Sequence, residues 1–278
     1  MSLIDPAALA ELLAEPDPAV PVVVCDARFY LGDIGQGARE YAEGHIPGAR
    51  FVDLHLQLAD PSIPDAGRHP LPSVAAFTEL LGSLGITAGT RVVAYDSAGG
   101  ATASRLWWML RSIGHGQVCL LDGGWPAWVA GGHPITTDTP DVTPVRYPPT
   151  DGWTGVVTAD QLADGLSYGA KVVDSRAPER YRGEVEPIDA QAGHIPGAIN
   201  VFHGTNVGAD GRFLPLGELV QRFARTGSNP IVYCGSGVTA CHNLFAMSLV
   251  NITGRLYPGS WSEWSSDPAR PVTTGDAP

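Results

Sequence analysis

Short apolar runs rich in valine and isoleucine alternate along this chain with longer stretches of helical spacing. The runs predict buried strands within residues 22–28, 91–96, 172–176 and 230–233. The longer stretches predict helices at residues 73–84, 103–113 and 238–250. Alternation of short strands with helices is typical of α/β domains. The pattern therefore predicts open, mainly parallel sheets with helices on both faces.

The chain carries the same set of motifs twice, which indicates two copies of one domain. Gly-His-Ile-Pro-Gly-Ala stands at residues 44–49 and again at 193–198. Three further pairs keep the same order: residues 22–28 with 172–176, 91–96 with 230–234, and 124–128 with 260–264. We place the domains at 1–145 and 146–278, with the boundary in a segment rich in proline and threonine. The tail after Asp267 is expected to fray or to wrap the first domain.

Cys234 begins the octapeptide Cys-Gly-Ser-Gly-Val-Thr-Ala-Cys, which joins a predicted strand to a predicted helix. A side chain at this point faces the backbone N–H groups of the turn and the start of the helix. Such an array stabilises an anion, so it favours the thiolate and predicts a nucleophile. Gly235 and Gly237 let the backbone fold tightly around whatever the sulfur carries. The alternative is a buried, inert cysteine, which is the usual fate of a free thiol.

Comparing the two copies separates structural residues from candidates for chemistry, because a motif present in both more often maintains the fold. His45 and His194 lie in the repeated turn, so we interpret both as structural. Asp96 stands in the first copy where Cys234 stands in the second, and it cannot act as a thiol. His69 has no histidine counterpart in the second copy, which favours a function over a solvated loop position. We therefore expect a catalytically silent first domain and a catalytic second domain.

The composition indicates which partners and which cellular location to expect. The 17 basic and 29 acidic residues give a net charge of −12, which argues against nucleic acid and an anionic membrane as partners. The apolar runs are too short to span a bilayer, and the N-terminus lacks the features of a signal peptide. The 4 cysteines have no Cys-x-x-Cys or zinc spacing. We expect reduced thiols, a cytoplasmic location and no metal.

Over its full length the chain resembles the tandem-domain rhodanese family. The resemblance rests on the repeated Gly-His-Ile-Pro-Gly-Ala turns and on the loop at residues 234–240, which is similar to that of the 3-mercaptopyruvate sulfurtransferase branch. Thiosulfate-preferring members typically carry basic residues directly after the cysteine, whereas this chain has the neutral pair Gly235 and Ser236. The resemblance therefore favours mercaptopyruvate as the sulfur donor. A thiosulfate:cyanide sulfurtransferase is the alternative.

The resemblance also implies a mechanism. Cys234 would take sulfur from mercaptopyruvate as a persulfide, release pyruvate, and pass the sulfur to cyanide or to a thiol acceptor, with a thioredoxin-like protein as one candidate. No metal or organic cofactor is required. The persulfide would be bound by the backbone N–H groups of Gly235, Ser236, Gly237, Val238, Thr239 and Ala240.

By the same resemblance, Arg180 binds the carboxylate of the substrate, because a guanidinium matches a carboxylate in a bidentate pair. Arg176 is matched by Arg28 in the first copy, so we interpret it as structural. The better-known mercaptopyruvate enzymes carry a second substrate arginine nine residues after the first, where this chain has Asp189. The missing arginine predicts a modest affinity for the substrate carboxylate.

The family's proton relay consists of a loop serine, a histidine from the first domain and an aspartate. Ser236 and His69 match the first two members. His55 stands at the aspartate position and Asp53 lies nearby, so the third member stays open between them. Cys241, on the predicted helix, is interpreted as a packing residue, with a disulfide or redox regulation as the alternative.

A phosphatase and a non-catalytic binding module are the two alternatives to a sulfurtransferase. Dual-specificity phosphatases that share the fold use Cys-x5-Arg to bind phosphate, but Ala240 stands where that arginine would be. A non-catalytic rhodanese-like binding module is the remote alternative. The intact loop that begins at Cys234 argues against it.

Overall fold

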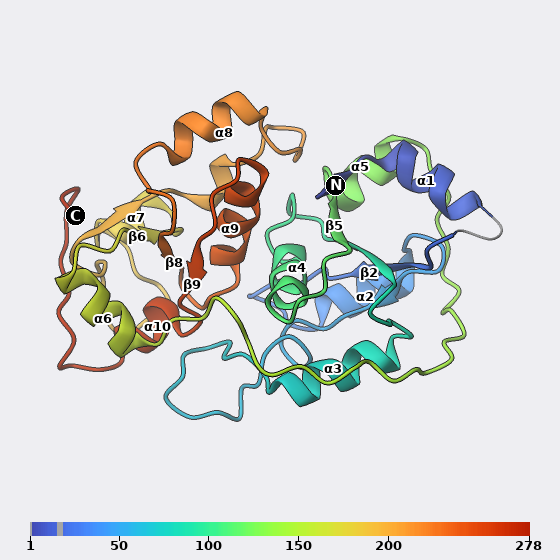
Figure 1. Cartoon of the computed structure of the whole chain (residues 1–278). Coiled ribbons are helices and arrows are strands. Elements are labelled where there is room, and N and C mark those ends of the chain that lie inside the picture. The colour runs from blue at the N-terminus through green and yellow to red at the C-terminus, as the bar shows by residue number, and fades with distance from the viewer. Residues whose placement is uncertain (1, 16–18) are drawn as a thin grey trace. The chain divides into compact units, whose positions relative to one another are not determined.

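The computed structural model describes residues 2–15 and 19–278, which divide into two compact units (Figure 1). Unit 1 comprises Met1–Ala59, Pro72–Thr154 and Val207–Phe213. Unit 2 comprises Asp60–Leu71, Gly155–Asn206 and Leu214–Pro278. Each unit therefore includes a short segment from the other half of the sequence. The predicted division into residues 1–145 and 146–278 stays a prediction.

Unit 1 is built on a parallel sheet with the strand order β1–β5–β4–β2–β3. Its strands are β1 (Leu3–Ile4), β2 (Val22–Asp26), β3 (Arg50–Phe51), β4 (Arg91–Tyr95) and β5 (Val118–Leu121). Nearly every residue of β2 and β4 is buried. A strand covered on both faces has no solvent side, which is why these sequences appear as continuous apolar runs.

Helices cover both faces of this sheet. They are α1 (Pro6–Ala14), α2 (Gln36–Glu43), α3 (Val74–Ser83), α4 (Ala103–Ser112) and α5 (Gly124–Ala130). Figure 1 shows α1 and α5 on one face and α3 and α4 on the other. The start of α3 is fixed by its N-cap residue Ser73, whose hydroxyl accepts a hydrogen bond from the N–H of Ala76 at 3.1 Å.

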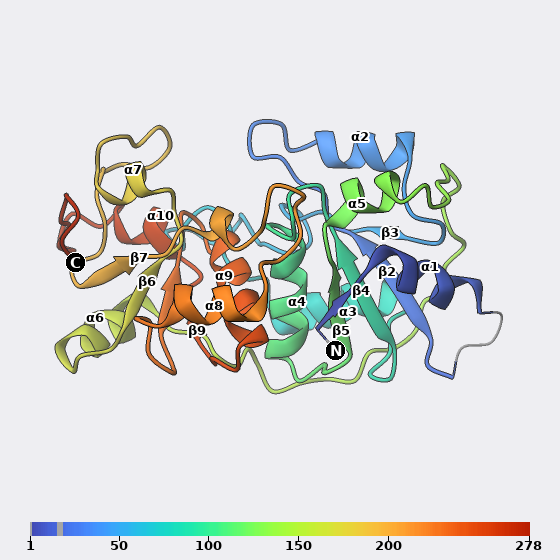
Figure 2. The same ribbon diagram turned by 90° about the horizontal axis from the view of Figure 1, so that it is seen from above.

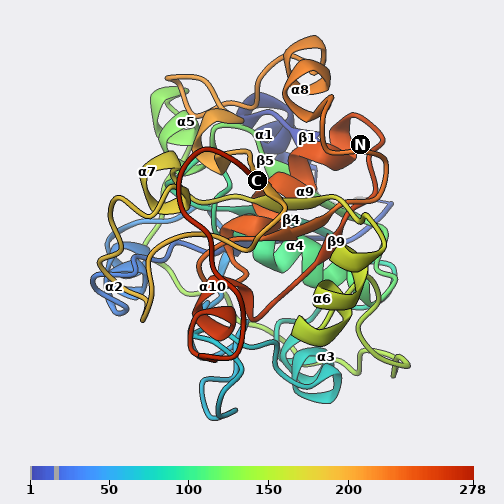
Figure 3. The same ribbon diagram turned by 90° about the vertical axis from the view of Figure 1, so that its left-hand side faces the viewer.

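Unit 2 repeats this architecture on a smaller parallel sheet with the order β7–β6–β8–β9. Figure 2 labels β7, β6 and β9 of this sheet. The strands are β6 (Val172–Asp174), β7 (Ala198–Asn200), β8 (Ile231–Tyr233) and β9 (Arg255–Leu256). The helices are α6 (Ala159–Ser167), α7 (Pro178–Tyr181), α8 (Leu216–Phe223), α9 (Thr239–Leu249) and α10 (Ser260–Trp264), with a 3-10 turn at His203–Thr205. Figure 3 shows α8 and α9 on one face and α6 and α10 on the other.

The two units build equivalent cores. In unit 1, Leu9 of α1 and Trp128 of α5 pack with Val93 of β4. In unit 2, Leu162 of α6 and Trp264 of α10 pack with Ile231 of β8. Burial of these apolar side chains is the main favourable contribution to folding. Two parallel sheets flanked by helices confirm the predicted fold class.

The repeated histidines are structural in both units. In unit 1 the His45 ring lies with Nδ1 2.7 Å from the carbonyl oxygen of Tyr41 and stacks on the Tyr41 ring. In unit 2 the His194 ring lies with Nδ1 2.7 Å from the carbonyl oxygen of Tyr181 and stacks on that ring. Both rings are buried and use the same contacts to fix the same turn, as the duplication predicts.

The C-terminal tail continues the repeat. Thr273 forms an antiparallel bridge with His194, as Thr136 does with His45. The Nε2 atom of His194 also lies 3.0 Å from the carbonyl oxygen of Ala277. The expectation that the tail frays is wrong, because these backbone and ring contacts fix it within unit 2.

Candidate active site

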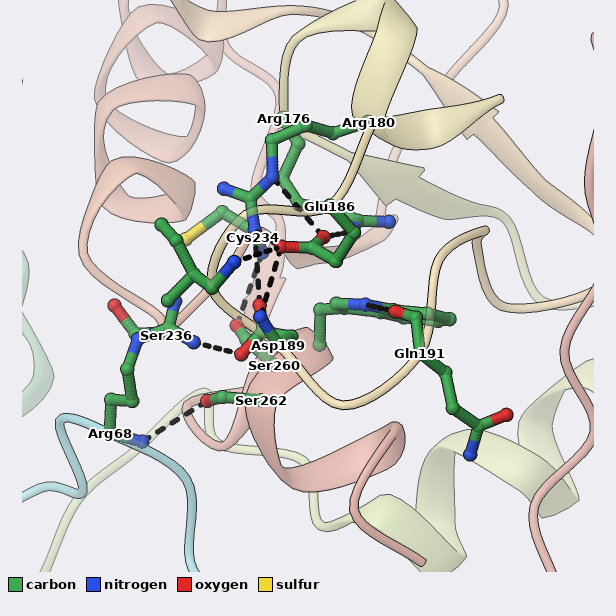
Figure 4. A network of polar contacts seen from close by, with 12 residues as sticks. Arg68, Arg176, Arg180, Glu186, Asp189, Gln191, Cys234, Ser236, Ser260 and Ser262 are labelled. Carbon is green, nitrogen blue, oxygen red and sulfur yellow. Dashed lines mark hydrogen bonds and ion pairs between the residues drawn. The ribbon is translucent and has the colours of Figure 1, made fainter. Parts of the chain in front are cut away.

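Cys234 lies directly after β8, in the loop that leads to α9 (Figure 4). Its backbone N–H donates to Oγ of Ser260 at 3.1 Å, and its carbonyl oxygen accepts the N–H of Trp261 at 2.9 Å. The sulfur accepts a hydrogen bond from the N–H of Gly237 at 3.1 Å. A buried sulfur that already accepts from its own loop is in a position where negative charge is stabilised.

Gly237 makes this turn possible. Its φ is +77°, in the left-handed region that favours glycine. A side-chain carbon at this position would also lie 2.3 Å from the carbonyl oxygen of Pro258, far inside contact distance. The second glycine of the loop is therefore required by both backbone conformation and space.

The rest of the loop leads into the start of α9. Val238 is the N-cap residue, and Thr239 and Ala240 form the first turn. The N–H groups in the first turn of a helix have no partner within the helix, and they form the positive end of its dipole. The structure thus places Gly235, Ser236, Gly237 and Val238 in the loop after Cys234, and Thr239 and Ala240 at the start of α9. Their binding of a persulfide stays a prediction.

Ser236 and His69 are brought together, although 167 positions separate them in the sequence. Nδ1 of His69 lies 2.8 Å from Oγ of Ser236, and both residues are buried. His69 lies in the segment Asp60–Leu71, which belongs to unit 2 with the cysteine loop. The contact gives the geometry for proton transfer between imidazole and hydroxyl.

The third member of the relay stays open. Asp53 and His55 belong to unit 1. Oδ1 of Asp53 accepts the N–H groups of His55 at 2.8 Å and Leu56 at 2.9 Å. This carboxylate oxygen therefore fixes its own turn, and a relay role for Asp53 or His55 stays a prediction.

Arg180 lies beside the cysteine loop and is paired with two carboxylates (Figure 4). Its Nε and Nη2 donate to Glu186 at 3.2 and 2.7 Å, and Nη2 also donates to Asp189 at 3.0 Å. Both carboxylates are almost fully buried, whereas the guanidinium is partly exposed. Arg180 is thus near the loop, as predicted, but it already has acidic partners that the sequence analysis did not assign.

Burial and charge act in opposite directions on these two carboxyls. Burial raises the pKa of Asp189, and the repulsion from Glu186 adds to this effect, while Arg68 and Arg180 oppose it. Burial also acts to raise the pKa of Glu186, but the hydrogen bonds from Arg180 and from the N–H of Asp189 outweigh it and lower the pKa. Relative to the ordinary pKa of each group, the surroundings therefore favour the ionised form of Glu186 and disfavour that of Asp189.

Arg176 has the structural position expected of it. It forms a bidentate pair with Asp174 and donates to the carbonyl oxygen of Gly193 at 2.6 Å. Arg28 in unit 1 forms the same pair with Asp26 and donates to the carbonyl oxygen of Gly44 at 2.8 Å. Equivalent buried contacts in a copy that lacks the cysteine support a role in the fold.

Arg68 also contributes to this site, although it was not among the residues predicted from the sequence. This residue directly precedes His69, forms an ion pair with Asp189, and donates its backbone N–H to Oγ of Ser262 at 3.1 Å. Comparison of the two copies did not single out Arg68, because Arg212 stands at the matching position of the other copy. A residue type present in both copies more often maintains the fold, so the repeat gave no reason to single out Arg68.

The matching loop of unit 1 binds its own anion. The Asp96 carboxylate accepts the N–H groups of Ala98, Gly100, Thr102 and Ala103 at 2.7–2.9 Å. It also accepts the hydroxyl of Thr102 at 3.0 Å. The donors of this loop are therefore occupied by a side chain of the protein, which supports the prediction that the first copy is catalytically silent.

The other three cysteines are buried, as packing residues would be, and the role of Cys241 stays a prediction. Burial raises the pKa of Cys25 to about 12 and that of Cys119 to about 11. Sγ of Cys241 donates to the carbonyl oxygen of Gly237 at 3.3 Å, so this thiol faces the backbone of the loop. None of the four cysteines, all of which lie in the described part of the chain, forms a disulfide.

Comparison with known proteins agrees with the duplication. A family model for the rhodanese-like domain matches residues 5–131 and 158–267. A protein from Pseudomonas aeruginosa, named probable 3-mercaptopyruvate sulfurtransferase, is 47% identical over 277 residues and 96% of each chain. The putative thiosulfate sulfurtransferase SseB of Mycobacterium tuberculosis is 42% identical over 99% of this chain and 98% of SseB.

A solved structure gives the same result at the level of the fold. SseA from Escherichia coli, described with the rhodanese fold of 3-mercaptopyruvate sulfotransferases, matches with a TM-score of 0.79. The two chains are 31% identical, and the match covers 94% of this chain and 100% of SseA. The chain therefore belongs to the rhodanese family of sulfurtransferases, with two copies of the domain in tandem.

Proposed function

We propose that the protein is a 3-mercaptopyruvate sulfurtransferase that works through a persulfide on Cys234. The observation that carries this proposal is the loop after β8, where the sulfur accepts a backbone N–H and Ser236 contacts His69. Gly235 and Ser236 carry no charge, and Ser236 is in contact with His69, so the pair can supply a proton to the leaving group of mercaptopyruvate. Relatives from Pseudomonas aeruginosa and from human carry the same activity in their names.

In the first half-reaction the Cys234 thiolate attacks the sulfur of mercaptopyruvate. A sulfur–sulfur bond forms while the carbon–sulfur bond breaks, and the electron pair goes to the carbon fragment as the enolate of pyruvate. Ser236, in contact with His69, is placed to supply the proton that this enolate needs. The loop N–H groups from Gly235 to Ala240 stabilise the charge of the persulfide.

In the second half-reaction an acceptor thiolate, or cyanide in an assay, attacks the outer sulfur and releases the Cys234 thiolate. This is a ping-pong cycle with a covalent intermediate. We infer a small thiol or a thioredoxin-like protein as the physiological acceptor. The chemistry uses only side chains and backbone donors of this chain.

The cycle requires a reduced thiol at every turnover, which favours the cytoplasm as its location. None of the four cysteines, all among the described residues, forms a disulfide, which is consistent with this inference. No helix of residues 2–15 and 19–278 is both long and apolar enough to cross a membrane.

Thiosulfate is the second candidate donor, and the name of SseB is the observation that favours it. Thiosulfate carries two negative charges at its sulfur group, and sulfite leaves without a proton. The residues directly after Cys234 carry no cationic side chain of their own, and only the enolate of pyruvate uses the proton that Ser236 and His69 can supply. Mercaptopyruvate is therefore expected to have the higher kcat/KM.

The test is mass spectrometry of the intact protein after incubation with mercaptopyruvate, alongside rates with both donors. The wild type should gain one sulfur atom and lose it on addition of cyanide. Cys234→Ser should do neither, while the control Cys241→Ala should behave as wild type. A persulfide on Cys241, or an equal kcat/KM for thiosulfate, would contradict the proposal.

A further inference from the structure

Two guanidinium groups lie at the residue that follows the nucleophile. A side-chain carbon placed on Gly235 would lie 2.9 Å from Nη2 of Arg68 and 3.6 Å from Nη1 of Arg180. Arg180 comes from α7 and Arg68 from the segment Asp60–Leu71, and both belong to unit 2. One terminal nitrogen of each arginine therefore faces the same point beside Cys234.

Carboxylates accept hydrogen bonds from Nη1 of Arg68 and from Nε and Nη2 of Arg180, while Nε of Arg68 is buried without a hydrogen-bond partner among the described residues. Asp189 receives Nη1 of Arg68 on Oδ1 and Nη2 of Arg180 on Oδ2 (Figure 4). Glu186 receives Nε and Nη2 of Arg180, and it also accepts the N–H of Asp189 at 3.1 Å. The carboxylates thus fix the two guanidiniums side by side. An arginine whose geometry is fixed in advance loses less entropy when it binds an anion.

The nitrogens that face Gly235 have no such partner. Within residues 2–15 and 19–278, no hydrogen bond uses Nη2 of Arg68 or Nη1 of Arg180. The side chains of Arg68 and Arg180 are 25% and 19% exposed, whereas those of Asp189 and Glu186 are 4% and 3% exposed. A ligand can therefore reach the arginines, while the acidic partners lie behind them.

We propose that Arg68 is the second carboxylate-binding arginine of this site, and that Nη2 of Arg68 and Nη1 of Arg180 together bind the carboxylate of an α-keto acid donor. This proposal rests on the proposed function, because it takes mercaptopyruvate as the donor. It replaces the expectation of a single substrate arginine. Asp189, at the position where better-known relatives have an arginine, positions the two guanidiniums without touching the substrate.

The charge balance limits the affinity. Arg68 and Arg180 face Glu186 and Asp189, and Arg176, which pairs with Asp174, also contacts Glu186 at 3.3 Å. The three guanidiniums and three carboxyls sum to zero when all the carboxyls are ionised. Binding of a carboxylate then depends on directed N–H donors and not on excess positive charge. A modest affinity with strict geometry is the result expected from such a site.

The test compares Arg68→Ala, Arg68→Lys and the control Arg212→Ala in the full chain. Arg212 holds the matching position in unit 1 and is 41% exposed, so its loss should leave the kinetics unchanged. Arg68→Ala should raise KM for mercaptopyruvate about ten- to a hundred-fold, as expected for a lost charge-assisted contact. Arg68→Lys keeps the charge but not the planar group, so its KM should lie between the two.

A second measurement distinguishes two roles of Arg68, namely binding of the substrate carboxylate and positioning of its neighbour His69. Pyruvate shares the carboxylate and lacks the sulfur, so its competitive inhibition constant reports the carboxylate contact alone. Arg68→Ala should raise this constant by the same factor as KM. An unchanged inhibition constant, with kcat alone reduced, would overturn the proposal and assign Arg68 to the support of His69. A wild type that does not turn over mercaptopyruvate would refute the proposed function, which is a different result.

Discussion

At the scale of single residues, the two copies of the domain differ in the anion that their matching loops contain. The Asp96 carboxylate accepts the N–H groups of its loop, whereas Cys234 offers a sulfur to Gly237. A carboxylate cannot take up a sulfur atom reversibly, while a thiolate can bind and release one. One substitution at the start of the loop thus separates a structural use of the same backbone donors from a chemical one.

The first prediction concerns Asp96. Asp96→Ala should lower the free energy of unfolding by at least about 2 kcal/mol, because buried N–H donors lose their acceptor. Turnover of the folded enzyme should stay close to that of wild type. Thermal melting and steady-state kinetics on the same preparation measure both effects. Loss of activity without loss of stability would show that the loop of unit 1 takes part in catalysis.

A second prediction at this scale concerns the proton. Ser236→Ala and His69→Ala should each lower kcat with mercaptopyruvate by ~10²-fold, the usual contribution of a general acid. Their effect on thiosulfate should be smaller, since sulfite leaves without a proton. Parallel assays with both donors give the comparison. Equal losses for the two donors would show that the pair supports the loop and does not transfer a proton.

At the scale of elements, the function depends on how a strand is connected to a helix. The loop between β8 and α9 has to turn sharply enough for its N–H groups to face the side chain that ends the strand. Gly237 allows this turn, with φ of +77° and the carbonyl oxygen of Pro258 where a side chain would be. The strand and the helix fix the ends of the loop, and the glycine fixes its path.

Gly237→Ala tests this dependence, with Gly169→Ala as a matched control. The two glycines have φ of +77° and +78°, so both variants should lose about 1–2 kcal/mol from the left-handed conformation. Gly169 has no neighbour within 4 Å of the added carbon, whereas Gly237 has the Pro258 oxygen at 2.3 Å. Overpacking should cost Gly237→Ala roughly 1–3 kcal/mol more.

The two glycine variants should also differ in their rate of sulfur transfer. Gly237→Ala should lose most of its sulfur transfer because the loop must shift, while Gly169→Ala should retain it. Melting temperatures and rates would be measured together. Equal activity in both variants would mean that the path of the loop is not needed for catalysis.

At the scale of the whole molecule, buried ionisable groups set the response to pH. Burial raises the pKa of Cys25 from 9.0 to about 12 and that of Cys119 from 9.0 to about 11. Both thiols lie in the core of unit 1. The folded protein keeps these protons at a pH where the unfolded chain releases them.

Stability should therefore fall as the pH rises above the unfolded value near 9. Each thiol should contribute a loss of about 1.4 kcal/mol between about pH 8 and pH 10, which is the linkage for one proton over one pH unit. Chemical denaturation at several pH values measures the slope. Cys25→Ala should reduce it, whatever its effect on stability at neutral pH. An unchanged slope would show that the thiol is ionised in the folded state.

Much of the architecture could be predicted because its signals are local. The valine-rich runs became β2, β4, β6 and β8, and the helix expected at residues 73–84 is α3, ending one residue inside each limit. The duplication predicted the equivalent roles of His45 and His194. The same reasoning failed for the tail, because its backbone pairs with a residue far away in the sequence and carries no apolar pattern.

Within the site, sequence alone predicted Cys234 as the nucleophile and determined the turn that follows it, because residues adjacent in sequence share one turn whose conformation glycine dictates. It also identified Ser236, His69 and Arg180 as candidates. Only the tertiary structure decided that Arg68 and Asp189, 121 positions apart, meet beside Gly235. The sum of charges around Arg180 and the occupied donors around Asp96 depend on folding in the same way. Electrostatic and hydrogen-bond energies act between neighbours in space, and folding chooses those neighbours.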